Sequence, residues 1–225
     1  MDEYDFIVGL DEFIASLKPK LSETISAKDY IDLIEYHKEK ERRELYLHGE
    51  VDYYSTQTII SAIMDYNRED KKDAYPFDKT TRKPIWLHIY SPGGETVAGS
   101  ALIDAMLQSQ TPIYTVNDGM AMSMAGLIFI AGTKRYSMER ATLMLHDGSM
   151  GVSGDVSKVK DYIEYQNKWE AKMKDFVLSH SKLTEEEYKD QSRADWYLLP
   201  DSAKEKGLVD FIIGPDCSLN DILPV

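Results

Sequence analysis

The sequence predicts an α/β protein with one main core, and two observations support that class. Apolar runs of strand length alternate with longer segments of helical periodicity along most of the chain, as expected when helices pack on a sheet. The chain has 225 residues, of which 43% are hydrophobic, which is ordinary for one soluble domain. No internal repeat interrupts this alternation.

Six short apolar runs bounded by turn residues predict the strands of the sheet. They cover residues 44–51, 84–90, 113–116, 135–138, 142–145 and 208–213. The second run leads at once into Ser91–Gly94, a sequence typical of a turn.

Apolar residues spaced by three and four predict the helices between these strands. They cover residues 29–43, a segment from a Ser55 cap to Met64, 95–108, 119–132, 155–180, a short helix opened by Thr184, and 202–206. Polar residues 67–83 predict a surface loop. The expected domains are an N-terminal arm with its helix, residues 1–43, and a main domain, residues 44–225.

The composition argues against several classes of partner. The formal net charge is −13, and phosphate groups are bound by clustered Lys and Arg, so we expect neither nucleic acid nor anionic membrane as a partner. The longest apolar run, Met120–Ala131, is too short to span a bilayer. The lone Cys217 can form no intrachain disulfide, and no zinc pattern is present, which favours a reducing, cytoplasmic setting without a metal.

Ser123 follows predicted strand residues and precedes an apolar helical segment. A serine at a strand-to-helix turn has the geometry of a nucleophile elbow, where neighbouring backbone leaves little room for side chains. The residues two positions away, Ala121 and Ala125, are small. A helix N-terminus there would also offer N–H groups to a developing oxyanion. On this segment alone, a serine tolerated inside a buried helix explains the residues better.

His146 follows the predicted strand 142–145, and α/β folds place functional groups at the carboxyl ends of strands. A histidine that is merely hydrogen-bonded at a strand end explains this position equally well. A triad would also need a carboxylate that orients the imidazole. Asp195 has apolar neighbours, but the residues alone do not choose it over Asp190 or Asp201.

The turn Ser91–Gly94 ends a predicted strand with two glycines. Glycine lets the backbone approach a ligand closely or adopt a positive φ. The turn therefore fits an oxyanion donor or a platform for a substrate strand. It fits a plain turn as well, because Pro-Gly-Gly turns are common.

Together, these segments resemble ClpP, the proteolytic subunit of the Clp protease. They occur in the order and approximate spacing of that family: Ser91–Gly94, Gly119–Ala125, Met144–His146, and Ala203 with Gly207–Asp210. The resemblance covers about residues 44–213, and the segments are specific collectively rather than singly. It implies the ClpP/crotonase-like α/β fold, with repeated β-β-α units and a long handle helix.

Carried over by position, the resemblance implies a role for five residues. Ser123 matches the nucleophile, His146 the general base and Asp195 the third member of the triad. Gly94 and Met124 match the backbone N–H donors of the oxyanion hole. The implied activity is that of a serine endopeptidase, which works through an acyl-enzyme and needs no cofactor or metal.

The resemblance also implies an assembly and a partner. The helix over residues 155–180 looks like the handle that joins two rings, which implies a homo-oligomer of heptameric rings, up to a tetradecamer. Such a chamber would degrade unfolded polypeptides fed by an AAA+ unfoldase. The family's unfoldase-docking pocket is apolar and aromatic, and four residues fit it: Trp86, Val116, Tyr136 and Met138. His88, Gln108 and Asp118 stand where that pocket usually has apolar residues.

Three other functions share parts of this pattern. A ClpP-like prohead protease of a phage would use the same triad outside the Clp machine. A structural ring subunit without activity would have no need of Ser123, His146 and Asp195, all of which are present. An acyl-CoA enzyme of the crotonase type shares the fold and the oxyanion-hole logic, but has no use for a Ser-His-Asp set.

Overall fold

The computed structural model describes residues 40–73, 82–148, 151–191 and 194–223. The chain divides into two units, residues 1–42 and 43–225. Nearly all of the first unit lies outside the described residues, so the N-terminal arm and its helix stay predictions. No described helix combines the length and the apolar composition that crossing a membrane requires.

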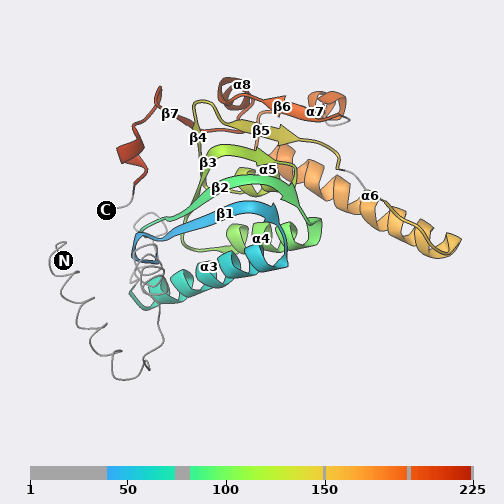
Figure 1. Ribbon diagram of the computed structural model, residues 1–225, viewed down its shortest axis with the longest axis horizontal. Helices are drawn as coiled ribbons and strands as arrows, with labels where there is room; N and C mark the ends of the chain where they lie inside the picture. The colour runs from blue at the N-terminus through green and yellow to red at the C-terminus, as the bar shows by residue number, and fades with distance from the viewer. Residues whose placement is uncertain (1–39, 74–81, 149–150, 192–193, 224–225) are drawn as a thin grey trace, which may run out of the picture. The chain divides into compact units, whose positions relative to one another are not determined.

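The described residues of the second unit form a seven-stranded sheet (Figure 1). Its strands are β1 (Glu44–Val51), β2 (Ile85–Gly94), β3 (Ile113–Met122), β4 (Lys134–Met138), β5 (Thr142–Leu145), β6 (Trp196–Leu198) and β7 (Phe211–Ile213). The strands β1-β2-β3-β4-β7 lie in this order and are all parallel. β5 pairs in parallel with the last residues of β3, and β6 pairs antiparallel with β5. The end of β3 is therefore the point where the sheet forks.

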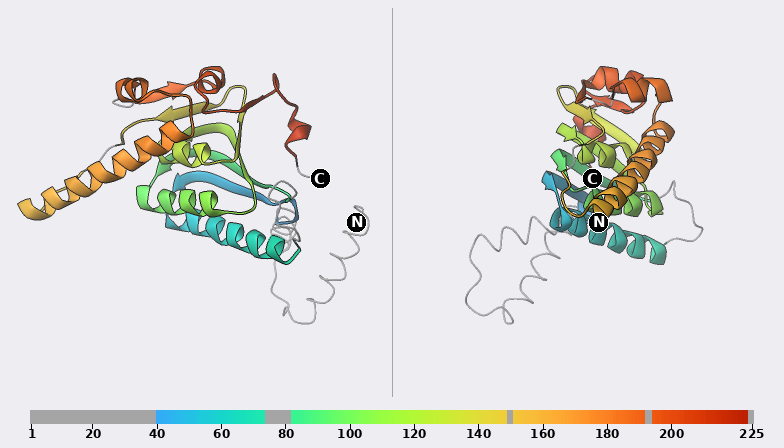
Figure 2. Two further views of the ribbon diagram at one scale, coloured as in Figure 1. Left: turned by 180° about the vertical axis from the view of Figure 1, so that it is seen from behind. Right: turned by 90° about the vertical axis from the view of Figure 1, so that its right-hand side faces the viewer.

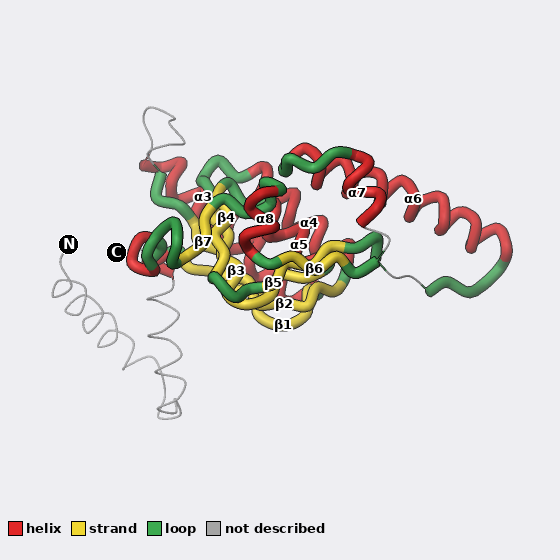
Figure 3. Tube along the Cα trace, turned by 90° about the horizontal axis from the view of Figure 1, so that it is seen from above, coloured by secondary structure: helices red, strands yellow, loops and turns green. Residues whose placement is uncertain are grey.

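Helices cover mainly one face of this sheet (Figure 3). The helical elements are α3 (Tyr53–Asp73), α4 (Thr96–Gln108), α5 (Met124–Ile130), α6 (Val156–Ser179), α7 (Glu185–Gln191), α8 (Pro200–Glu205) and the 3₁₀ helix η2 (Leu219–Asp221). α3, α4 and α5 pack on the sheet, whereas α6 runs out beyond its edge (Figure 2). Among the residues of α6, all of them described, only Val177 is buried.

The two faces of the sheet carry different side chains, as β2 shows. Successive side chains of a strand point to opposite faces. Leu87 and Ile89 belong to the main core beneath the helices. Trp86 belongs instead to a second, smaller hydrophobic cluster on the other face. The core that positions the fold and the cluster on the opposite face are therefore separate.

Helix α3 begins before its predicted cap and ends later than predicted. Asp52, rather than Ser55, caps it: Asp52 Oδ1 accepts the Ser55 N–H at 2.8 Å, and Ser55 Oγ accepts the Asp52 N–H at 3.0 Å. The helix continues to Asp73, so the prediction of a loop was wrong for residues 67–73, whereas residues 74–81 of that predicted loop lie outside the described residues. Asp70, near the end of this helix, is buried and accepts hydrogen bonds from Arg43 and Thr111.

Near Ser123, two boundaries also differ from their predictions. β2 runs through Gly94, in register with Val51 of β1, so the glycine pair ends a strand rather than forming a separate turn. β3 continues to Met122, and the helix predicted over residues 119–132 begins only at Met124. Both extensions carry the strands up to Ser123.

Candidate active site

Ser123 occupies the turn between β3 and α5. Its φ of 53° and ψ of −125° lie in a region that residues with a side chain rarely adopt. The Ser123 N–H donates to the carbonyl of Met144 at 2.9 Å, which ties the turn to the end of β5. A strained strand-to-helix turn of this kind presents the serine Oγ at the edge of the sheet.

The turn can form because the residues around it are small. Ala121 and Ala125 are both fully buried. Gly93 has a φ of 99°, and a Cβ added there would lie 2.7 Å from the carbonyl oxygen of Met122 and 2.8 Å from Ser123 Cβ. The end of β2 therefore packs directly against the serine turn, at a distance that only glycine permits.

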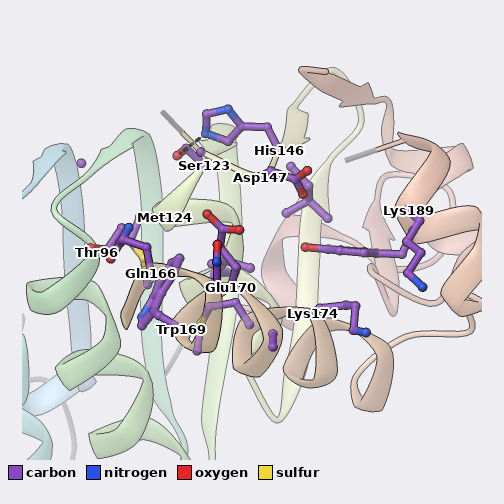
Figure 4. A pocket seen from close by; sticks show the side chains of 18 residues that line it. Thr96, Ser123, Met124, His146, Asp147, Gln166, Trp169, Glu170, Lys174 and Lys189 are labelled. Atoms are coloured by element: carbon purple, nitrogen blue, oxygen red, sulfur yellow. Dashed lines mark hydrogen bonds between the residues drawn. The ribbon is translucent and has the colours of Figure 1, made fainter. Parts of the chain in front are cut away.

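His146 directly follows β5, and its imidazole lies beside the serine (Figure 4). Nε2 lies 2.7 Å from Ser123 Oγ, and Nδ1 lies 3.2 Å from Asp195 Oδ1. A single tautomer satisfies both contacts, since Nδ1–H then donates to the carboxylate while Nε2 accepts from the hydroxyl. The structure thus brings together the three residues that the resemblance implied as a triad.

Asp195 reaches His146 through β6, a strand that the sequence patterns do not predict. β6 pairs with β5 in an antiparallel register that, continued by one residue, places Asp195 opposite His146. Of the three carboxylates left open by the sequence, Asp195 is thus the one that lies within 3.2 Å of the imidazole, rather than Asp190 or Asp201. Its side chain is 55% exposed and also accepts a 3.4 Å hydrogen bond from the Tyr197 hydroxyl.

Gly94 and Met124 line the same cavity as Ser123 and His146. Met124 is the first residue of α5, and the first N–H groups of a helix lack intrahelical acceptors. Gly94 has a φ of 153°, and a Cβ there would collide with the backbone of Val51. Both residues implied as oxyanion donors therefore line the cavity beside the serine: Gly94 at the end of β2 and Met124 at the start of α5.

The cavity beside Ser123 has a volume of about 410 Å³. Its far wall comes from α6 and α7 (Figure 4), and includes Trp169, Glu170, Lys174, Tyr188 and Lys189. Burial, followed by the charges of Asp147 and Glu170, raises the pKa of Tyr188 to about 12, so this phenol is neutral at physiological pH. The sequence patterns predict none of the wall residues as part of a site. The helical spacing of apolar residues that includes Trp169 is the one pattern that involves the wall, and such spacing indicates core packing rather than a site.

The arrangement of these residues agrees with comparisons to known proteins. The family model described as Clp protease matches residues 33–216, which is most of the chain. The chain belongs to the Clp protease family. The predicted resemblance to the ClpP family and the predicted α/β fold class are thereby confirmed.

Curated relatives in this family are proteolytic subunits of ATP-dependent Clp proteases. Subunit 1 of Rhodopirellula baltica is 31% identical over 185 residues, which cover 80% of this chain and 77% of that protein. Subunit 3 of Streptomyces avermitilis is 35% identical over 133 residues, or 58% of this chain and 61% of that protein. Subunit 2 of Corynebacterium efficiens is 31% identical over 173 residues, or 76% and 82%. These relatives support a Clp-type protease.

Proposed function

We propose that this chain is a serine endopeptidase that hydrolyses peptide bonds inside an oligomeric ring. The observation that carries the proposal is the line of contacts from Ser123 Oγ through the His146 imidazole to the Asp195 carboxylate, with distances of 2.7 and 3.2 Å. Such a line is what nucleophilic catalysis by a serine requires.

In the proposed mechanism, His146 Nε2 takes the hydroxyl proton as Ser123 Oγ attacks the peptide carbonyl. The N–H groups of Gly94 and Met124 hold the resulting oxyanion, and losing one such donor typically costs ~100- to 1000-fold in kcat. His146 then protonates the leaving amine, and water hydrolyses the acyl-enzyme with His146 again acting as base. Asp195 holds the imidazole in one tautomer and stabilises its charged form.

The proposed assembly is a homo-oligomer of heptameric rings that pair through α6. The first half of this helix exposes apolar side chains, with exposed fractions of 40–73%: Val156, Tyr162, Ile163 and Tyr165. Neighbouring exposed apolar residues mark protein–protein contacts. Native mass spectrometry should give the mass of one ring or of two, and a monomer would contradict the assembly.

The proposed partner is an AAA+ unfoldase that feeds unfolded polypeptides into the ring in the cytoplasm. The names of the relatives support an ATP-driven partner, because they describe ATP-dependent proteases. The lone cysteine supports a reducing compartment.

Labelling with a fluorophosphonate tests the nucleophile directly. The assembled wild-type protein should take one label per chain and hydrolyse a fluorogenic peptide, whereas Ser123→Ala should do neither. Ser61→Ala, which alters an exposed serine of α3, should behave as the wild type does. If the assembled wild-type protein takes no label, the chain is not a serine peptidase.

A further inference from the structure

A second hydrophobic cluster lies on the sheet face opposite the main core. Its buried residues are Trp86, Val116, Tyr136, Ile213 and Ile222. The first four stand on β2, β3, β4 and β7, and the Tyr136 ring lies 5.4 Å from that of Trp86 and stacks on Phe211 at 5.0 Å. Ile222 alone comes from outside the sheet, out of the segment that follows β7.

Two side chains of that segment reach the cluster: Ile222, which is buried in it, and Cys217, which packs against it. The described residues after β7, residues 214–223, are exposed except for Cys217, which is half-buried, and Ile222, whose exposure is 0%. Leu219 and Leu223, on either side of Ile222, are 48% and 46% exposed. A short exposed stretch of chain therefore has one fully buried side chain, that of Ile222.

The polar contacts of the segment hold its base rather than its tip. At the base, Asp216 Oδ2 accepts the Ile212 N–H at 2.6 Å, and Gly214 N–H donates to the Cys217 carbonyl at 2.8 Å. At the tip, Ser218 and Asp221 hydrogen-bond each other in a capping box that closes η2. Among the described residues, the hydrogen bonds of residues 218–222 stay within the segment. The tip is thus a turn closed by its own hydrogen bonds, and Ile222 is its one buried side chain.

We propose that Ile222 is an exchangeable plug in a peptide-docking site, and that a partner's loop bearing an aliphatic side chain displaces it. A region with few buried apolar contacts opens far more readily than a core strand. When η2 leaves, the aromatic and aliphatic side chains around Ile222 form a site already shaped to an aliphatic residue. The identity of the partner rests on the unfoldase proposed above. The displacement of Ile222 by a peptide does not depend on that proposal.

The plug sets the apparent affinity of the partner. Burial of one isoleucine side chain favours the closed segment by roughly 10- to 100-fold. A ligand that binds only the open form loses the same factor in apparent affinity. The segment would thus restrict docking to partners that bind strongly or that present several loops at once.

A fluorescein-labelled peptide of residues 218–225 tests the exchange by fluorescence anisotropy. The full chain with Ile222→Ala should bind this peptide roughly 10- to 100-fold more tightly than the wild type, because its own plug is gone. Leu223→Ala, which truncates an exposed neighbour, should bind as the wild type does. A peptide with alanine in place of Ile222 should bind neither chain. Equal affinity for the wild type and Ile222→Ala, or no binding to Ile222→Ala, would overturn the proposal.

Cys217, the single cysteine of the chain, reports opening of the segment without any peptide. Burial, followed by the charges of Asp221 and Asp216, raises the pKa of its thiol, so the closed segment should react slowly with a thiol reagent. Ile222→Ala should accelerate this labelling about 10-fold or more. Labelling at the wild-type rate would count against an exchangeable plug.

Ser123→Ala separates this proposal from the proposed catalysis. That variant should keep the wild-type labelling rate of Cys217 and the wild-type affinity for the peptide, because Ser123 lies outside the cluster. A failure of peptide hydrolysis in the wild-type chain would therefore leave the plug test unaffected, and a failure of the plug test would leave the proposed triad unaffected.

Discussion

The two halves of the proposed triad are built in different ways. Ser123 and His146 follow β3 and β5, and the turn that carries Ser123 is enclosed by the buried residues Ala121 and Ala125. Asp195 is 55% exposed and precedes a three-residue strand that pairs, among the described strands, with β5 alone. The positions of Ser123 and His146 thus depend on the main core, whereas the position of Asp195 depends on a strand at the periphery. Substitutions in one half should therefore leave the structure of the other half intact.

The largest effects are expected at the core-built half. Ser123→Ala and His146→Ala should each lower kcat on the order of 10⁶-fold, and the double variant should lose no more than either single one, because the residues act as a unit. Initial rates on a fluorogenic peptide measure the loss, with circular dichroism as the check on folding. A multiplicative loss in the double variant would show that the two residues act separately.

Substitution of Asp195, the peripheral member, should lower kcat less than substitution of Ser123 or His146 and should leave stability unchanged. Asp195→Asn should lower kcat about 10⁴-fold, since the wrong tautomer of His146 is then favoured. Its Tm should stay near that of the wild type, because changes at exposed side chains usually move stability by no more than about 0.5 kcal/mol. Tyr197→Phe, which removes the 3.4 Å hydrogen bond to Asp195, is the matched control and should keep most of the activity. A large fall in Tm for Asp195→Asn would mean that β6 is structural.

A glycine pair tests whether the core really shapes the serine turn. Gly93→Ala puts a Cβ within 3 Å of Met122 and Ser123, and should lower both the Tm and kcat, the latter about 100-fold or more if the turn shifts by an ångström. Gly49→Ala has a similar φ, 88° against 99°, but no atom within 4 Å of the added Cβ. It should therefore show only backbone strain, of about 1–2 kcal/mol, with kcat unchanged. Equal effects of the two substitutions would contradict a close-packed turn.

The sequence predicted most elements of the fold because their patterns are local. β1, β5 and α4 match their predicted bounds to within one residue. The junction of β3 and α5 was misplaced, because residues 119–132 are apolar apart from Ser123 and carry no period that marks a boundary. The pairing of Ser91 with Ala121, together with the pairing of Met120–Met122 with β5, shows that β3 continues there. β6 escaped prediction because three residues are too few to show alternation.

The site was predictable to a similar degree. The order of motifs pointed to Ser123 and His146, and their contact in the structure agrees with the expected geometry. The position of Asp195 follows from the pairing of β6 with β5, which no local pattern contains. The cavity wall escaped the sequence for the same reason: Trp169 and Tyr188 reach the site only because α6 and α7 fold back toward the serine.

The smallest effect is expected far from both halves, at Asp70. Its carboxylate accepts hydrogen bonds from Arg43, at 2.9 Å, and from Thr111, and joins α3 to the starts of two strands. Asp70→Asn should lower the free energy of unfolding by about 2 kcal/mol, as measured by urea denaturation, and leave kcat unchanged. Asp65→Asn, on the same helix but 57% exposed and paired with the exposed Arg68, should change it by less than about 0.5 kcal/mol.

The pH dependence of that difference follows from the pKa of Asp70. Burial raises this pKa, but the hydrogen bonds from Arg43 and Thr111 and the charge of Arg43 outweigh it, so the pKa lies below its usual value of 3.8. A depressed pKa gives stability that is present above the unfolded value and lost as the pH falls through the folded one. The gap between the wild type and Asp70→Asn should therefore be full at pH 7 and shrink below about pH 4. A gap that stays constant down to pH 3 would show that the shape of the side chain, rather than its charge, anchors α3.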